Sequence, residues 1–338
     1  MQKAKTINTG EKKSEFNGKC QLYNEDLQKA REEISKAVVG QDHVVNSLFR
    51  ALIASGNVLL EGVPGIAKTL LVKTLASVTG CSFKRIQFTA DLLPTDITGI
   101  TAYDEKKGFY VVKGPIFSNF VLADEINRAP PKAQSALLEC MQEKQATIGK
   151  ETYNIDRPFF VLATQNPIES LGTYPLPEAQ VDRFLFKLNI MYPDINQEKE
   201  ILEKNMTLEG LEKPEMKIIL TKEKLLAMQS DVHKIFMDDK VRQYLVSLVD
   251  ATRFPKNYHL KMGKYIEWGC SPRASIGLFI AAKAEALMNN RNYVTPNDVK
   301  TIAHDVLRHR ILLNYEGQSE GINSDSVIDE ILEKVPIP

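Results

Sequence analysis

The sequence predicts an α/β fold in which a core built on a parallel sheet is followed by a separate helical domain. Three observations favour this fold class. Residues 61–69 follow an apolar run and have the glycine spacing of a phosphate-binding loop. Two further apolar runs, residues 120–123 and 159–163, end in polar residues, as buried strands of a parallel sheet do. From about Pro193 onward, helical patterns follow one another.

The composition is that of an ordinary globular protein with one or two domains. The chain has 338 residues, of which 43% are hydrophobic and 25% are charged. The 43 basic residues balance 43 acidic ones, which argues against a dedicated nucleic-acid or membrane-surface binder, although a neutral total can contain a local basic patch. The four cysteines are scattered, so we expect reduced thiols and no zinc site.

The beginning of the chain carries no sign of a targeting segment. Residues 1–19 are polar and lysine-rich and lack the apolar centre of a signal peptide. The most apolar long run, residues 276–288, is interrupted by Lys283 and Glu285 and is too short to span a bilayer. We therefore expect a cytoplasmic protein with no membrane span, in which residues 1–25 form a polar arm that is disordered or becomes ordered only on contact.

The first chemical motif is Gly62-Val-Pro-Gly-Ile-Ala-Lys-Thr69, which a helical pattern follows. The backbone N–H groups of such a loop bind phosphate oxygens, and the helix N-terminus adds partial positive charge. Lys68 would reach the β- and γ-phosphates, and Thr69 would ligate Mg²⁺. Ala67 replaces the second glycine of the usual pattern, which costs little in a helical conformation but strains the loop if a positive φ is required. An ordinary strand–turn–helix connection is the alternative.

The second motif is an acidic pair, Asp124 and Glu125, directly after the apolar run at 120–123. Carboxylates at the carboxyl end of a buried strand are costly to desolvate unless a cation or water uses them. The functional interpretation places Asp124 near Mg²⁺ and gives Glu125 the polarisation of an attacking water. The alternative is a helix N-cap, because a helix with Pro130 and Pro131 in its first turn begins soon afterwards.

A third strand ends near Asn166, whose amide could bond both a γ-phosphate oxygen and the attacking water, although Asn-Pro is also a common turn dipeptide. Two β-hairpins interrupt the α/β alternation. The sequence predicts one over residues 100–112, turning at 104–108, and another over residues 145–155, turning at Gly149 and Lys150. Such insertions suggest surfaces that face a partner or a pore, and simple surface elaboration is the alternative.

Two arginines occupy positions suited to phosphoryl transfer. Arg183 lies in a short helix over residues 176–184, and Arg273 lies at the start of a helix that carries Ile276, Phe279 and Ile280. An arginine stabilises the charge of a phosphoryl-transfer transition state from the same subunit or from a neighbour. For each arginine taken alone, a surface or ion-pair role is the favoured interpretation.

The order of these motifs and the amino-acid sequences around them resemble those of the MoxR family of AAA+ ATPases. The matching segments are Val39-Gly-Gln-Asp42, the phosphate loop, residues 85–99, Gly114-Pro-Ile-Phe117, Ala123-Asp-Glu-Ile-Asn-Arg-Ala-Pro-Pro131 and Tyr174-Pro-Leu-Pro-Glu-Ala-Gln180. The resemblance extends from about Asp26 to the C-terminus. This family often has alanine at the position of Ala67, and the two hairpins match its helix-2 insert and its pre-sensor-1 hairpin.

The resemblance implies a role for each motif residue. ATP would be bound by Val39, Gly40, Gln41, Gly62, Val63, Pro64, Gly65, Ile66, Ala67, Lys68, Thr69 and Leu70, with Val39–Gln41 near the adenine. Thr69 and Asp124 would hold Mg²⁺, and Asp124 and Glu125 would form the Walker B pair. Asn166 would be sensor 1, and Arg273 would be sensor 2, acting in cis. Arg183 would be the finger that enters the neighbouring subunit's site, and Arg128 is the alternative for that role.

The family pattern also implies a domain division, with a nucleotide-binding core at 26–192 and a helical lid at 193–338. The lid residues support this interpretation through an apolar helix face at residues 241–249. Thr295-Pro-Asn-Asp298 has the pattern of a helix N-terminus. His304 and His309 match no metal-site spacing, so we interpret both as packing or solvent-facing side chains.

By resemblance, the protein is a Mg²⁺-dependent ATPase that works as a homo-oligomeric ring, a hexamer, and acts as a chaperone-like motor on a protein client. Such ATPases commonly act with a partner that carries a von Willebrand factor A domain. Three alternatives remain open: a nucleic-acid motor, a magnesium-chelatase motor subunit, and a partner-gated nucleotide switch without useful turnover. Neutral charge and the lack of an added DNA-binding domain argue against the first.

Overall fold

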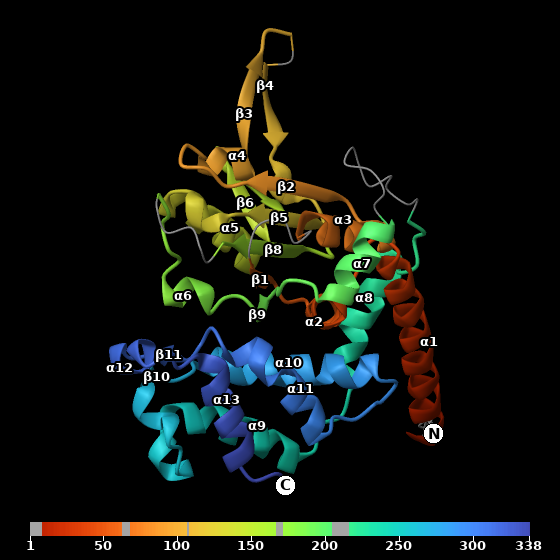
Figure 1. Ribbon diagram of the computed structural model, residues 1–338. Helices are drawn as coiled ribbons and strands as arrows, with labels where there is room; N and C mark the ends of the chain where they lie inside the picture. Colours follow the sequence, from red (N-terminus) through yellow and green to blue (C-terminus); the bar gives the residue numbers. More distant parts are fainter. Residues whose placement is uncertain (1–8, 63–67, 107, 167–171, 205–215) are drawn as a thin grey trace, which may run out of the picture.

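The computed structural model describes residues 9–62, 68–106, 108–166, 172–204 and 216–338, and the side chains from residue 16 onward (Figure 1). At its centre is a five-stranded sheet with the order β2-β5-β8-β1-β9, in which all pairs are parallel. The strands are β1 (Val58–Glu61), β2 (Phe83–Gln87), β5 (Phe120–Asp124), β8 (Phe160–Gln165) and β9 (Phe186–Asn189). The predicted α/β fold class and parallel sheet are therefore confirmed.

Alternate residues of the central strands enter two hydrophobic clusters, one on each face of the sheet. Val58 and Leu60 join α2 (Asp42–Ile53) and α3 (Lys68–Val78) on one face. Leu59 joins the other face, where α5 (Pro131–Glu143) packs. A strand covered on both faces needs apolar residues at every position, which explains the continuous apolar runs in the sequence.

Short helices connect these elements at the margins of the core. They are α4 (Pro94–Thr98), α6 (Glu178–Val181), α7 (Ile195–Lys204) and the 3-10 turns η1 (Pro115–Phe117) and η2 (Ile126–Arg128). The predicted helix with prolines in its first turn is α5. The short helix predicted over residues 176–184 is present only as α6, so Arg183 lies beyond its C-terminal end and not within it. The chain leaves the sheet after β9, near the proposed domain boundary at 192/193.

The C-terminal part of the chain is helical and lies below the β9 edge of the sheet in Figure 1. It contains α8 (Lys222–Asp231), α9 (Asp239–Arg253), α10 (Pro272–Met288), α11 (Pro296–Leu307), α12 (Tyr315–Ser319), α13 (Ser324–Lys334), the turns η3 (Val232–Lys234), η4 (Pro255–Tyr258) and η5 (Met262–Tyr265), and a ribbon of β10 (Ile266–Trp268) and β11 (Leu312–Leu313). As predicted, α11 begins with a capping box between Thr295 and Asp298. In the described part of the chain, none of the helices combines the length and apolar character needed to cross a bilayer.

Buried polar contacts join the helical domain to the core. Arg50 of α2 forms an ion pair with Glu285 of α10, and both side chains are about nine-tenths buried. The hydroxyl of Ser47 donates to the carboxylate of Asp305 on α11 at 2.6 Å. Removing one partner of such a pair leaves a buried charge uncompensated, so these contacts hold α2 against the lid.

The N-terminal segment is ordered where the structure describes it. Residues 9–35 form one helix, α1 (Thr9–Ser35), so of the two alternatives the disordered arm is wrong for the described part, and an arm ordered by contact agrees with the structure. Cys20 is 1% exposed, and the Tyr23 hydroxyl donates to Asp231 of α8 at 2.8 Å. The polar composition misled the prediction because one buried stripe is enough to dock a helix whose other faces are solvated.

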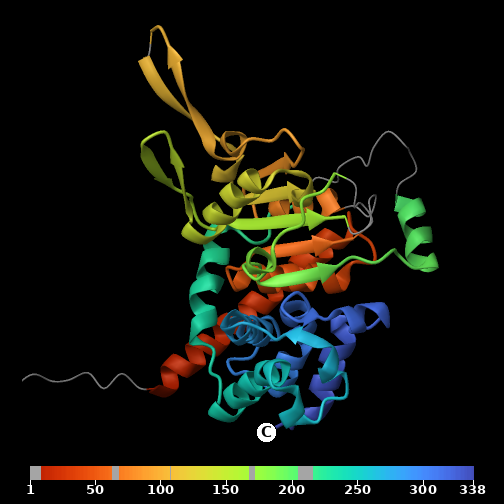
Figure 2. The same ribbon diagram turned by 90° about the vertical axis from the view of Figure 1, so that its left-hand side faces the viewer.

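Both predicted hairpins are present. The longer one pairs β3 (Gly99–Asp104) with β4 (Gly108–Lys113) and projects from the core, as Figure 2 shows. The shorter one pairs β6 (Gln145–Ile148) with β7 (Glu151–Asn154) on the same side of the molecule. Near the tip of the longer hairpin, Tyr103 and Phe109 are 64% and 79% exposed and their ring centroids lie 5.1 Å apart. These aromatic side chains face solvent and contribute nothing to the core.

Candidate nucleotide-binding site

Four of the predicted site residues, Lys68, Asp124, Glu125 and Asn166, lie at the carboxyl edge of the sheet. The order of the three central strands places β8 between β5 and β1. Asp124 ends β5, Asn166 follows β8, and Lys68 begins α3 shortly after β1. Because all strands are parallel, their carboxyl ends share one edge, and Asn166 lies between the acidic pair and the start of the phosphate loop.

The structure describes the two ends of the phosphate loop. Val63, Pro64, Gly65, Ile66 and Ala67 lie outside the described residues. Gly62 is buried and its N–H donates to the Gln165 carbonyl at 3.3 Å, which fixes the start of the loop to β8. The Lys68 ammonium donates to the Gly62 carbonyl across the loop. Lys68, Thr69 and Leu70 form the first turn of α3 and are partly exposed, so a ligand can reach them.

Asp124 is held on both sides. Its Oδ1 accepts from the Thr164 hydroxyl of β8 at 2.6 Å. Its Oδ2 accepts from Nε and Nη2 of Arg85 on β2 at 2.9 and 2.7 Å. The side chain is only 14% exposed, so these donors compensate for the water that a buried carboxylate loses. Asp124 is therefore fixed in orientation before any ligand arrives.

Glu125 has a left-handed backbone conformation, with φ 57° and ψ 50°. Its N–H donates to the Thr164 hydroxyl oxygen at 2.8 Å, and its carboxylate accepts from Gln87 of β2 at 2.7 Å. The same carboxylate oxygen lies 3.2 Å from Nη1 of Arg128. Non-glycine residues in this conformation cluster at functional sites, because the surroundings must enforce it. Here the chain turns at Glu125, and the glutamate does not cap a regular helix.

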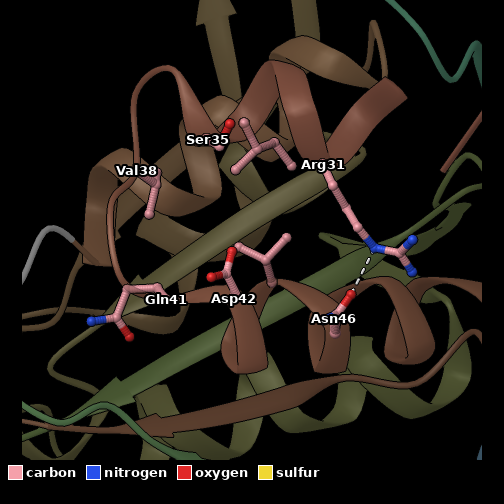
Figure 3. A pocket seen from close by; sticks show the side chains of 8 residues that line it. Arg31, Ser35, Val38, Gln41, Asp42 and Asn46 are labelled. Atoms are coloured by element: carbon pink, nitrogen blue, oxygen red, sulfur yellow. Dashed lines mark hydrogen bonds between the residues drawn. The ribbon is translucent and has the colours of Figure 1, made fainter. Parts of the chain in front are cut away.

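The predicted adenine segment connects α1 to α2. Gly40 has φ +72°, and a Cβ there would lie 2.5 Å from Cδ of Gln197. Glycine is therefore needed both for the turn and for the approach of α7. Figure 3 shows the neighbouring crevice between the two helices, where the Arg31 guanidinium donates to Asn46 at 2.7 Å. Its volume of about 20 Å³ suits roughly one water molecule, so this crevice is not itself a nucleotide pocket.

Arg183 and Arg273 line one cavity of about 350 Å³, and both are exposed. Residues 55–57, which precede β1, and residues 184–185, which precede β9, form part of its wall. The cavity thus lies at the amino ends of these strands, whereas the phosphate loop follows the carboxyl end of β1. Five residue steps of a strand, from Asn57 to Gly62, span roughly 17 Å.

Arg273, which the resemblance assigns to the nucleotide of its own subunit, lines the cavity at the amino ends of the strands. In this structure the start of α10 faces the amino end of β1, away from the subunit's own phosphate loop. The lid packs beside the β9 edge of the sheet and contacts α2 through the buried Arg50–Glu285 pair. In this packing Arg273 and Arg183 line the same cavity. Arg128 instead pairs with Glu125 of its own subunit.

Sequence reasoning missed the residues that orient the acidic pair. Arg85 and Gln87 are two positions apart on β2 and reach Asp124 and Glu125 respectively. Their spacing places both on one face of a strand, which is a signal that was available. Thr164 is fully buried within the apolar strand β8 and bonds both members of the pair. The only sign of this role in the sequence was that Thr164 is a polar residue within a largely apolar strand.

The sheet order, the loop and the acidic pair together define a P-loop nucleotide-binding protein with an appended lid. Comparison with models of known protein families gives the same class. Residues 57–186 match the model described as "ATPase family associated with various cellular activities (AAA)", and residues 262–331 match the AAA lid domain.

Comparison with individual relatives assigns the chain to a family within this class. Chaperone MoxR1 of Mycobacterium tuberculosis is 46% identical over 92% of this chain and 82% of its own length. Protein MoxR of Methylorubrum extorquens is 29% identical over 90% of this chain and 93% of its own. The crystal structure of a candidate ATPase from Cytophaga hutchinsonii superposes with a TM-score of 0.90 at 48% identity, covering 98% of this chain and 100% of that one. The chain belongs to the MoxR family of AAA+ ATPases.

Proposed function

We propose that this protein hydrolyses ATP in a Mg²⁺-dependent reaction at the carboxyl edge of the sheet and works as a ring. The observation that carries the proposal is the fixed acidic pair beside Asn166 and Lys68. Within this proposal Lys68 and the α3 N-terminus bind the phosphates. Val39, Gly40 and Gln41 lie near the adenine, and the phosphate loop from Gly62 to Leu70 surrounds the phosphates.

The donor set at this edge fits a magnesium ion. Asp124 offers a carboxylate oxygen and Thr69 a hydroxyl oxygen, and hard cations prefer such ligands. A bound Mg²⁺ would neutralise phosphate charge during phosphoryl transfer. Thr164 and Arg85 hold the Asp124 carboxylate in place. Glu125 orients and polarises the attacking water, and Asn166 holds that water near the γ-phosphate.

We assign Arg183 and Arg273 to the nucleotide of a neighbouring subunit. Both line the cavity at the amino ends of β1 and β9, on the side of the molecule away from their own phosphate loop. A ring in which each site receives these guanidinium groups from its neighbour makes assembly a condition for turnover. A hexamer is the ring size that the family suggests.

The work of the ring is proposed to be chaperone-like, as the name of the M. tuberculosis relative states for that protein. The exposed aromatic residues of the β3–β4 hairpin suit contact with a protein client. A partner with a von Willebrand factor A domain and a cytoplasmic location are the further expectations of the family. Neutral net charge makes a nucleic-acid substrate the weaker alternative.

A mixed-ring experiment tests the proposal. Arg183→Ala subunits keep an intact nucleotide site but offer no finger, whereas Lys68→Ala subunits offer the finger but do not turn over ATP. Each variant alone should show turnover reduced by about 10³-fold or more, and a mixture should regain activity because the defects lie on opposite sides of one interface. Absence of rescue at ring-forming concentrations would exclude the trans role of Arg183. Arg128→Ala, tested in the same way, decides between the two arginines.

A further inference from the structure

Asp182 links the segment that carries Arg183 to the lid. It caps the C-terminus of α6, and its carboxylate is 20% exposed. Oδ1 accepts from Nε of Arg310 at 2.7 Å, and Oδ2 accepts from the Ser271 hydroxyl at 2.8 Å. Ser271 and Arg310 both belong to the lid, so one carboxylate of the core is bonded by two lid side chains.

Arg310 holds the backbone on both sides of Arg183. Its side chain is 3% exposed. Nη2 donates to the carbonyls of Asp182 and Phe184 at 3.1 and 2.6 Å, and Nη1 donates to the carbonyl of Leu185 at 3.2 Å. Nη1 also donates to Val306 on α11. A guanidinium buried to this extent is tolerated only when its donors are satisfied, and here the fork bonds the finger segment to the end of α11.

Ser271 connects the same carboxylate to Arg273. It is the N-cap of α10, and its hydroxyl oxygen accepts from the Arg273 N–H at 3.1 Å while the hydroxyl donates to Asp182. Arg183 follows Asp182 in the chain, and Arg273 follows Ser271 by two positions. The two exposed arginines are therefore attached to one hydrogen-bonded cluster of Asp182, Ser271 and Arg310, called the clamp here.

Arg183 and Arg273 come from different domains, 90 positions apart in the sequence, yet they line one cavity. Without a direct link, any shift of the lid relative to the sheet would change their separation. Charge stabilisation in phosphoryl transfer depends on donors already held in place, and a displacement of about 1 Å can reduce the rate 10²-fold. The clamp provides such a link, because it bonds the backbone of 182–185 to the start of α10 and to the end of α11.

We propose that Asp182 and Arg310 are positioning residues that hold Arg183 and Arg273 as one unit, which is presented to the nucleotide of the neighbouring subunit. Neither residue contacts the substrate in this scheme. The inference rests on the proposed trans role of the arginines, and it adds that the lid and the finger segment act together and that the start of α10 belongs to the same catalytic surface.

Asp182→Asn tests the clamp with little change in shape, and Arg310→Lys keeps the charge but removes the fork. We expect each to reduce kcat by roughly 10–100-fold while the Kd of a non-hydrolysable ATP analogue stays within about two-fold, because the subunit's own nucleotide site is intact. Mixed with Lys68→Ala subunits, Asp182→Asn subunits should regain turnover, since they then receive well-placed arginines from their neighbours. A general folding defect would not be rescued by a neighbour.

Asp298→Asn is the matched control. Asp298 is 2% exposed and pairs with Arg291, so this variant also weakens a buried ion pair of the lid, but in the first turn of α11, whereas Arg310 contacts Val306 in its last turn. It should lower the thermal midpoint while turnover per folded subunit stays near that of the wild type. Loss of turnover equal to that of Asp182→Asn would overturn the positioning role and indicate general lid damage.

The outcomes separate the two proposals. If Arg183→Ala is rescued in mixed rings but Asp182→Asn and Arg310→Lys retain full turnover alone, the clamp is refuted and the trans arginine stands. If Arg183→Ala is not rescued, the trans role itself fails. If Asp182→Asn loses turnover and remains inactive beside Lys68→Ala subunits, the defect lies in its own site and the positioning role is again refuted.

Discussion

Single residues decide how the acidic pair is presented. Thr164, buried in β8, donates to Asp124 and accepts from the N–H of Glu125, so one hydroxyl orients both carboxylate residues. Asp124, Glu125 and Asn166 were predictable because polar residues that end apolar runs are costly unless used. Arg310 was not predictable, because a basic residue near a helix end has no local sign of burial, and only tertiary packing gives it partners.

His309 illustrates a residue whose chemistry follows from burial. It packs inside the protein, as one of the two interpretations allowed, and its Nε2 bonds the Phe184 carbonyl at 3.1 Å. Its Nδ1 has no partner among the described residues. Burial, followed by the charge of Arg310, lowers the pKa of His309 well below 6.5. Lys187 and Arg308 lower this pKa further.

Acid should therefore destabilise the folded protein through His309. The unfolded chain binds a proton at an ordinary histidine pKa and the folded chain does not, so the stabilisation is complete above about pH 6.5 and is lost as pH falls below it. We expect the free energy of unfolding to fall by up to about 1.4 kcal/mol per pH unit below that point from this group. Denaturant titrations of the wild type and His309→Gln from pH 7 to 5 measure the difference, with His304→Gln as the control. If the free energy of unfolding fell equally steeply with pH in the wild type and in His309→Gln, the proposed contribution of His309 would be contradicted.

At the scale of elements, α1 shows where composition alone fails. The hairpins, α5 and the start of α11 were predicted because turn glycines, prolines and caps act locally. The docking of α1 depends on distant partners such as Asp231 and the Met288 carbonyl, which local patterns do not contain. The edge strands β2 and β9 were missed for a related reason, because each contains only two apolar residues, separated by polar ones, and lacks a long apolar run.

Because α1 buries one face and exposes the other, we expect substitutions along this helix to differ in their effect on folding stability. Cys20 is 1% exposed and Leu22 is 60% exposed. Cys20→Asp buries a carboxylate beside Asp231 and should cost roughly 3 kcal/mol of folding stability, whereas Leu22→Asp should change it by about 0.5 kcal/mol or less. Thermal or denaturant unfolding of the two variants compares them directly. Equal effects would mean that α1 does not pack against the lid as the structure has it.

At the scale of the whole molecule, the hydrophobic cluster on the α2 and α3 face continues without interruption into the lid. This continuity and the buried Arg50–Glu285 pair pack α2 tightly against the lid. The domain order was predictable from the sequence, because the phosphate loop and the helical patterns follow one another along the chain. The packing of the lid was not, since it depends on buried pairs between distant helices, and this packing sets the position of Arg273.

The packing also separates the two sets of residues to which we assign the reaction. One set comprises the phosphate loop and the acidic pair, and the other comprises Arg183 and Arg273. A molecule with complementary halves of one site on opposite sides associates head to tail and closes into a ring when the rotation between subunits allows it. If Arg183 and Arg273 act in the neighbouring site, as we propose, an isolated subunit is catalytically incomplete.

The most direct test is Mg²⁺-dependent ATP turnover per subunit as a function of protein concentration. We expect turnover per subunit to be very low in dilute solution, to rise with concentration and then to level off, in step with ring formation observed by light scattering. Glu125→Gln, measured alongside, should bind ATP and assemble but show almost no turnover. Full turnover per subunit at concentrations where light scattering reports monomers would contradict the claim, because the site would then be complete within one chain.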